Sequence, residues 1–430
     1  MIPKIYSING GKGKLLAVST DRFKSELLTL QFAVPLQKET AQRYTLLLEL
    51  LCRGTEQYPS RALFSRRLDD LYATAVAPYS RRIGDMQILG FTTEFLGAHY
   101  VGGGNGILQD VIQMLSQLLL RPYLPGGVFH LPYLESEKNH LRDAIRARIN
   151  HPRAYARGKC RTLLFEGEPC AFLQLGEEET VDAITAADLT LLWQDMVQNL
   201  SPTFFYVGNT PGEELAQLLE TSFTMNGGFS HPYHTLVRPY IGDPVKAEEE
   251  MPLCQSKLAI GFRTDVTLSH PLAPATAVLN DILGGSPASK LFLNVREKRS
   301  LCYHCSSTYD IYKGAIFAEA GISSQNRAET EQAIRTEFDA LARGEISSVE
   351  WNAAKQLYEF LYKQVFDHPS SVCSFYMGRD LIGFEQTLEQ YRKAIAAVTR
   401  EDVVEAATHL REGAEFFLQG ALNGEEDEEE

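Results

Sequence analysis

Apolar and polar residues follow patterns along this chain that predict both strands and helices. Two stretches, Met86–Leu96 and Ala315–Ile322, are dominated by apolar residues over strand-like lengths. After Gly106, apolar residues recur at helical spacing from Ile107 to Leu119, which predicts a helix with one apolar face. Strands grouped with helices, without strict alternation of the two, favour α+β domains whose helices pack on one face of a sheet.

The same order of features occurs twice, which indicates an internal duplication. The matched pairs are Gln31-Phe32 with Gly261-Phe262, Leu51 with Leu283, Gly84 with Gly314, Lys138 with Lys355, Thr185 with Thr399, and Phe204-Phe205 with Phe416-Phe417. The separation between partners begins at 230 to 232 residues and falls to 212. Chance matches would not keep the same order, so the sequence predicts two copies of one domain. Thr185 and Thr399 each precede an aspartate by three residues, which predicts a capped helix start in both copies.

The predicted domain boundaries follow from this duplication. The first copy spans residues 1–210 and the second spans residues 251–423. Residues 211–250 contain four prolines and a charge cluster at residues 248–250, which predicts a short helix followed by an interdomain linker. Residues 424–430 form an acidic tail, and its last six residues contribute −6 to the net charge of −14. Such a run is typical of a solvated, disordered end.

Composition narrows the class of protein. With 44% hydrophobic and 22% charged residues among 430, the chain is an ordinary globular protein rather than a disordered, collagen-like or coiled-coil one. Purely apolar runs are too short to span a bilayer, and the N-terminus has no signal-peptide pattern. Seven scattered cysteines predict reduced thiols, so we expect a cytoplasmic protein. The acidic balance argues against nucleic acid or an anionic membrane as the main partner.

Two segments together indicate a family. Residues 43–55, RYTLLLELLCRGT, end in Gly-Thr, and a later glycine pair, Gly284-Gly285, leads through Arg296 to Tyr303 seven residues on. These segments resemble the two domain signatures of the insulinase (pitrilysin) family of zinc peptidases. The resemblance covers nearly the whole chain, at the size of half-length bacterial members that pair as dimers. It implies two homologous α+β domains, each a mostly antiparallel sheet with helices packed on one face, as in the mitochondrial processing peptidase.

The zinc motif of that family is missing from this chain. In H-x-x-E-H, histidines four apart on one helix face bind Zn²⁺, and the glutamate acts as general base. Aligned on the Gly-Thr pair, its positions hold Thr45, Leu48 and Glu49, and the family's third ligand falls on Ala144. The ten histidines include no pair four apart, so the motif has not moved elsewhere. We therefore expect no catalytic residue, metal or cofactor in this chain, and zinc in a partner subunit.

Arg296 and Tyr303, by contrast, are both present. From the residues alone they are a helix-surface charge and a half-buried strand aromatic. In the family, this pair supports the substrate carbonyl and backbone opposite the zinc, and a guanidinium and a phenol are suitable donors for that purpose. The second domain of one half faces the first domain of the other half in the family. The resemblance therefore implies that Arg296 and Tyr303 bind peptide and complete a partner's active site in trans.

Other motifs in the sequence give weaker indications of a functional site. Cys302 and Cys305 have C-x-x-C spacing, but period-two alternation on a predicted strand would place them on opposite faces, so we expect neither chelation nor redox work. His231 and His234 lie in the proline-rich linker, and we expect them to be solvated. The glycine-rich residues 102–106 and 10–14 do not match a P-loop. We expect a strand-to-helix turn at the first and a hairpin tip at the second.

The sequence leaves three alternative functions open. The first is a non-catalytic subunit of a heterodimeric zinc metallopeptidase, which binds peptide as an added strand and pairs with a homologous subunit carrying H-x-x-E-H. The second is a peptide-binding or scaffold protein of the same fold with no part in proteolysis. The third is a self-sufficient enzyme that uses Glu49 and Asp143 with another metal. Whether the chain alone forms a homodimer stays open.

Overall fold

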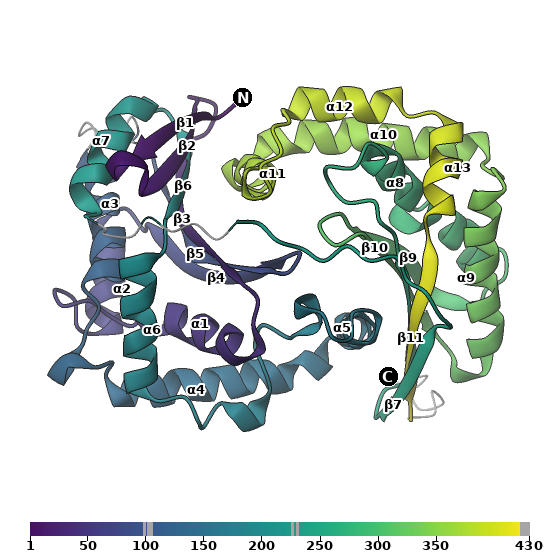
Figure 1. The fold of residues 1–430 in the computed structure, drawn as a ribbon, viewed down its shortest axis with the longest axis horizontal. Coiled ribbons are helices and arrows are strands. Elements are labelled where there is room, and N and C mark those ends of the chain that lie inside the picture. Colours follow the sequence, from purple (N-terminus) through teal and green to yellow (C-terminus); the bar gives the residue numbers. More distant parts are fainter. Residues whose placement is uncertain (98–99, 101–105, 225–227, 229–231, 422–430) are drawn as a thin grey trace, which may run out of the picture. The chain divides into compact units, whose positions relative to one another are not determined.

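The computed structural model describes residues 1–97, 100, 106–224, 228 and 232–421, which form two compact units (Figure 1). The first unit comprises Met1–Arg146, Phe172–His234 and Gln364–Thr387, and the second comprises Ala147–Ala171, Thr235–Lys363 and the chain from Leu388 onwards. Each unit takes in a segment from the other half of the sequence. The units therefore differ from the continuous ranges 1–210 and 251–423 expected above. The predicted acidic tail, residues 424–430, lies outside the described residues, as do residues 102–105 and His231.

The first unit is built on a six-stranded sheet with the order β1-β2-β6-β3-β5-β4. Its strands are β1 (Lys4–Ile8), β2 (Gly13–Ser19), β3 (Ser25–Pro35), β4 (Ala75–Ile83), β5 (Met86–Leu96) and β6 (Thr203–Gly208). Neighbouring strands are antiparallel except β2 and β6, which run parallel. Gly10 and Gly11 have positive φ in the turn between β1 and β2, where the hairpin tip was predicted.

Helices cover one face of this sheet and bury its apolar side chains. They are α1 (Lys38–Leu51), α2 (Arg61–Asp70), α3 (Gly106–Leu120), α4 (Leu131–Arg146), α6 (Ala186–Asn199) and α7 (Gly212–Ser222). Alternate residues of β3, Leu28, Leu30 and Phe32, join the core that these helices cover, as the two-residue period of a strand requires. The predicted apolar face from Ile107 to Leu119 is buried on α3, which confirms the helical spacing seen in the sequence.

The second unit repeats this arrangement on a five-stranded sheet with the order β7-β11-β8-β10-β9. Its strands are β7 (Val245–Met251), β8 (Ser256–Arg263), β9 (Cys302–Asp310), β10 (Ala315–Ile322) and β11 (Arg411–Gly420). Only β7 and β11 among these pairs run parallel. Its core is covered by α8 (Ala273–Asn280), α9 (Arg327–Ala342), α10 (Ser348–Gln364), α12 (Leu388–Ala397) and α13 (Arg400–Thr408), with π-helical turns at Asp281–Gly285 (η7) and Leu291–Glu297 (η8).

The two sheets share one topology, because β2-β6-β3-β5-β4 corresponds strand for strand to β7-β11-β8-β10-β9. Individual hydrogen bonds also recur at corresponding positions of the two units. Thr185 and Thr399 form the same capping box at the starts of α6 and α13. Lys138 donates to the carbonyl of Asp182 in the first copy, and Lys355 donates to several carbonyls in the matching loop of the second. These features confirm the prediction of two homologous α+β domains.

One further helix packs on the opposite face of each sheet, and it comes from the other half of the sequence. Helix α5 (Pro152–Leu164) packs on β8 and β11, and helix α11 (Pro369–Leu381) packs on β3 and β6. Each begins at a His-Pro pair whose proline occupies the first turn, where a missing N–H does no harm. We call α5 and α11 the exchanged helices.

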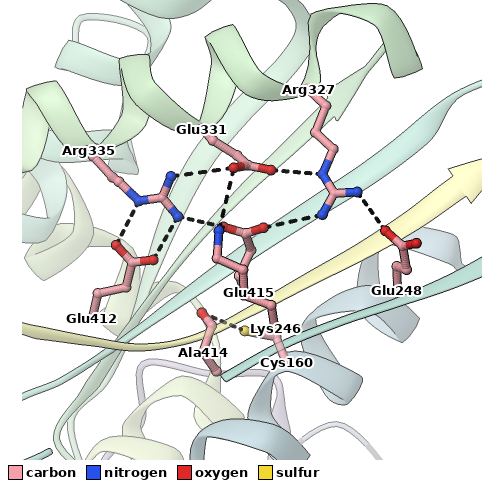
Figure 2. A network of polar contacts seen from close by, with 9 residues as sticks. All are labelled: Cys160, Lys246, Glu248, Arg327, Glu331, Arg335, Glu412, Ala414 and Glu415. Carbon is pink, nitrogen blue, oxygen red and sulfur yellow. Dashed lines mark hydrogen bonds and ion pairs between the residues drawn. The ribbon is translucent and has the colours of Figure 1, made fainter. Parts of the chain in front are cut away.

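Strand β7 lies in the stretch expected to be a linker, and its sequence is rich in charge rather than in typical strand residues. An ion-pair network attaches it to its neighbours (Figure 2). Lys246 Nζ lies 3.0 Å from an oxygen of the fully buried Glu415 on β11, and Glu248 pairs with Arg327 of α9 at 2.7 Å. Charged residues are common on edge strands, where they discourage pairing with other chains.

Candidate functional site

The positions that align with the zinc motif lie on α1, which packs against α4. The Thr45 hydroxyl donates to the Ala41 carbonyl at 3.1 Å and lies 3.2 Å from Ser80 Oγ on β4. Leu48 is 1% exposed and belongs to the core of the first unit. Two of the three aligned side chains are therefore engaged in holding α1 in place.

Glu49, the third aligned residue, is exposed on α1, and Ala144 is exposed on α4. Desolvation raises the pKa of Glu49, and the negative charge of Glu137 raises it further. Glu137 is buried on α4, where it forms an ion pair with Arg53 and lies 3.1 Å from His140 Nδ1. The buried carboxylate beside Glu49, that of Glu137, is thus already paired with Arg53.

Arg296 and Tyr303 occupy neighbouring segments of the second unit. Arg296 lies on the π-helical turn η8, with its guanidinium carbon 4.6 Å from the centre of the Phe292 ring. Its side chain is 39% exposed and lies 3.5 Å from a carboxylate oxygen of Glu297. Tyr303 is 72% exposed near the start of β9. Both side chains are available to a molecule outside this chain.

A pocket of about 380 Å³ brings the two residues together. Its lining consists of Arg296, Glu297, Ser300, Leu301, Cys302, Tyr303, Ser323 and Asn326. Ser300 has a φ of 52°, a left-handed conformation that is uncommon outside glycine and that often marks functional sites. The pocket is thus lined by an arginine and a tyrosine together with serine, asparagine and cysteine residues.

A β-bulge explains why Tyr303 points outward. In the ladder between β9 and β10, Gly321 pairs with His304 and the next residue, Ile322, pairs with Cys302. Tyr303 is therefore the extra residue of the bulge and has no partner of its own on β10. A bulge changes the direction in which a side chain points, because one extra residue interrupts the alternation along the strand, and bulges are frequent beside functional sites.

The same bulge corrects the expectation for the two cysteines. Cys302 and Cys305 were predicted to lie on opposite faces of the strand, and this is wrong. The extra residue between them shifts the alternation by one, so both thiols are buried in the same core, at 8% and 4% exposure. A hydrogen bond from Cys305 lowers the pKa of Cys302; burial opposes this effect, and the charge of Arg296 reinforces it.

Comparisons with known proteins agree with this geometry. Residues 183–358 match a family model described as "Peptidase M16 inactive domain". YmfF of Bacillus subtilis, described as a "probable inactive metalloprotease", is 27% identical over 406 residues, which are 94% of this chain and 95% of YmfF. YmxG of the same organism, described as an "uncharacterized zinc protease", is 28% identical over 36% of this chain and 39% of its own length.

Solved structures show the same fold over the whole chain. A conserved protein from Enterococcus faecalis V583 is 25% identical and has a TM-score of 0.89, with 99% of this chain and 100% of that one covered. A structure described as a peptidase M16 inactive domain from Pseudomonas fluorescens has a TM-score of 0.80 at 15% identity, with 98% and 99% covered. In sequence and in fold, the chain is thus similar to proteins of the insulinase (M16) family.

The family model and the relative that covers nearly the whole chain are both described as inactive, and this chain is similar to them. The residues at the aligned positions do not fit a zinc ion. Thr45 has a hydroxyl that donates to the backbone, Leu48 is a buried aliphatic side chain, and Ala144 has only a methyl group. Among the described residues, no cluster of metal-binding side chains includes Glu49 or Asp143. The fold shared with these relatives therefore occurs here with residues at the aligned positions that do not fit zinc.

Part of the pocket that Arg296 and Tyr303 line was not predicted. Ser323 and Asn326 come from the connection between β10 and α9, and Asn326 precedes the first residue of α9. Neither belongs to a motif, and only the sheet topology brings them beside Arg296. None of the helices in the described part of the chain combines the length and apolar composition needed to span a bilayer.

Proposed function

We propose that this chain is the non-catalytic subunit of a heterodimeric zinc metallopeptidase. In this proposal it binds a peptide substrate and supplies Arg296 and Tyr303 to a homologous partner subunit that carries H-x-x-E-H. The observation that carries the proposal is that both side chains are exposed and line one pocket. Relatives described as zinc proteases, such as YmxG, illustrate the kind of partner required.

The chemistry of the pocket supports this role. A guanidinium and a phenol both donate hydrogen bonds, and such donors stabilise the negative charge that develops on a carbonyl oxygen during peptide cleavage. Glu297, 3.5 Å from Arg296, is itself exposed and forms only a long contact with it. The guanidinium is therefore not locked into a buried ion pair within this chain.

Peptide binding in an extended form is consistent with the position of Tyr303. Strand β9 forms one edge of the five-stranded sheet, opposite β7, and Tyr303 lies near its start. An edge strand can pair with a peptide through backbone hydrogen bonds while pockets select side chains. The proposal places the complex in the bacterial cytoplasm, where it would mature or degrade peptides, as expected from the sequence.

The test compares peptidase activity and zinc content in three samples. These are this chain alone, the H-x-x-E-H homologue of the same genome alone, and their mixture, each with a library of internally quenched peptides. We expect activity only in the mixture, with zinc present in the homologue. A homologue that is equally active alone would remove the in-trans role and favour the scaffold function. Activity of this chain alone that a chelator abolishes would favour a self-sufficient enzyme.

Substitutions then test the two residues. Arg296→Ala is expected to lower kcat/KM of the mixture by roughly 10- to 100-fold, and Tyr303→Phe by about 10-fold, because each removes one donor to the developing charge. Arg299→Ala is the matched control, since Arg299 is exposed nearby but does not line the pocket. Co-elution of the two subunits in gel filtration checks that assembly survives. Full activity of both pocket variants would contradict the assignment.

A further inference from the structure

Cys302 and Cys305 form a thiol pair beside the pocket that peptide binding leaves unexplained. The bulge at Tyr303 places both side chains in one core, three residues apart on the same face of the strand. Cys302 also lines the pocket, whereas Cys305 does not. Cys302 is thus part of the pocket wall, at 8% exposure, and Cys305 lies beside it in the core.

The surroundings of Cys302 differ from those of other buried thiols in this chain. Burial raises the pKa of Cys373 to about 12 and raises the pKa values of Cys52 and Cys160 well above the ordinary range. The pKa of Cys302 is instead lowered, by the Cys305 hydrogen bond and by Arg296, against the effect of burial. Since the thiolate is the reactive form, the lowered pKa and the position at the pocket together distinguish Cys302 from these three cysteines.

We propose that Cys302 is a site of reversible thiol–disulfide exchange with a low-molecular-weight disulfide that enters the pocket. The Cys302 thiolate attacks one sulfur of that disulfide. The sulfur–sulfur bond of the small molecule breaks, a mixed disulfide forms on Cys302, and the second half leaves as a thiolate. The Cys305 thiol keeps its proton, because its hydrogen bond stabilises the Cys302 thiolate before the attack. An excess of free thiol reverses the reaction.

Modification would have a direct consequence for the pocket. The attached group would occupy part of the 380 Å³ that Arg296 and Tyr303 also line. If these two residues bind peptide, the mixed disulfide excludes the peptide and switches the complex off. This consequence, unlike the exchange reaction itself, rests on the proposed function.

The exchange reaction can be measured on the full chain without a partner or a peptide. Cys254 is exposed, so Cys254→Ser provides the background in which only less accessible thiols remain. The probe is dithiobis(nitrobenzoic acid), a small disulfide whose released half absorbs light. We expect the folded chain to release one equivalent in a fast phase, and peptide mapping to locate the attached group on Cys302. The fast phase should already be present at about pH 7, below the range where an ordinary thiol ionises.

Further variants separate the role of each group. In the Cys254→Ser background, Cys302→Ser should abolish the fast phase. Cys305→Ala should slow it by about tenfold, whereas Cys305→Ser, which keeps a donor, should restore most of the rate. Cys373→Ser is the matched control and should leave the rate unchanged, because Cys373 is buried beside Thr29 in the first unit.

The proposal would be overturned by a folded chain that lacks the fast phase, by labelling at a cysteine other than Cys302, or by a rate that Cys305→Ala leaves unchanged. Mapping on the chain with Cys302 intact keeps the test decisive if Cys302→Ser fails to fold. A labelled chain that still supports full activity in the mixture would remove only the consequence for peptide binding. Failure of the proposed function therefore leaves the exchange reaction standing, and the converse also holds.

Discussion

Asp281 illustrates how a single buried carboxyl group makes stability depend on pH. It lies at the start of the π-helical turn η7 and is 8% exposed. Burial raises its pKa to about 6, although hydrogen bonds with Tyr358 and Asn280 act in the opposite direction. The folded state therefore holds this proton more tightly than the unfolded chain does. Its contribution to stability is full below about pH 4 and is lost as the pH rises through about 6.

We expect Asp281→Asn to raise the free energy of unfolding at pH 7 by about 1–3 kcal/mol, because a neutral amide removes the cost of ionising a buried group. At pH 4 the same substitution should have a much smaller effect. Urea denaturation at both pH values measures the difference. Asp339→Asn is the control, since Asp339 is exposed on α9 of the same unit. An equal effect of Asp281→Asn at the two pH values would contradict the assignment.

At the residue scale, the sequence supports predictions where a motif fixes the spacing and fails where the backbone departs from regularity. Arg296 and Tyr303 are named by their spacing after a glycine pair, and the structure places both on one pocket. The mutual position of Cys302 and Cys305 was predicted wrongly because no residue type at Tyr303 signals a bulge. A strand of strict alternation would have separated the two thiols.

At the element scale, the local signals are the most reliable. The capping boxes of α6 and α13 were predicted from a threonine and an aspartate three residues apart, and both form as expected. Their bonds lie within one turn of chain, so tertiary context has little influence on them. Strand β7 shows the opposite case, because partners on β11 and α9, distant in the sequence, hold its charged side chains.

The two caps offer a paired measurement. Thr185→Ala and Thr399→Ala should each lower the free energy of unfolding of the unit that contains the helix by about 1 kcal/mol, since each leaves a backbone N–H at the helix start without its acceptor. Thr→Ser at the same positions keeps the hydroxyl and should lose much less. Thermal unfolding followed by calorimetry compares the four variants. Equal losses for Ser and Ala would show that the hydroxyl is not what stabilises the helix start.

At the scale of the whole molecule, the duplication was visible in the sequence but the exchange of helices was not. Ordered matches show which segments correspond, and His151-Pro152 and His368-Pro369 are one such correspondence. The apolar residues of α5 would suit either sheet, so periodicity cannot say which one it covers. The contacts of Arg153 and Arg157 with Glu319 on β10 show its place, at 2.8 and 2.9 Å.

Glu319→Gln is expected to loosen the attachment of α5 to its sheet. Glu319 is 2% exposed, and the substitution removes the charge that both arginines contact, for a loss of about 1–2 kcal/mol. Hydrogen exchange followed by mass spectrometry should show faster exchange in residues 152–164 and unchanged exchange in α1. Glu329→Gln on the exposed first turn of α9 is the control. Unchanged exchange in α5 would mean that its apolar contacts alone hold it.

The exchanged helices also bear on how such a repeat began. A single copy on its own would carry a helix with no sheet to cover and would leave one face of its own sheet bare. Two separate copies would meet both needs by trading these helices, as domain-swapped dimers do. Fusion of two genes for such a swapped dimer would yield the present pattern, in which α5 and α11 each complete the other copy's fold. Neither half of the chain would then be a self-contained folding unit, and recombination of one half without the other would produce an incomplete protein.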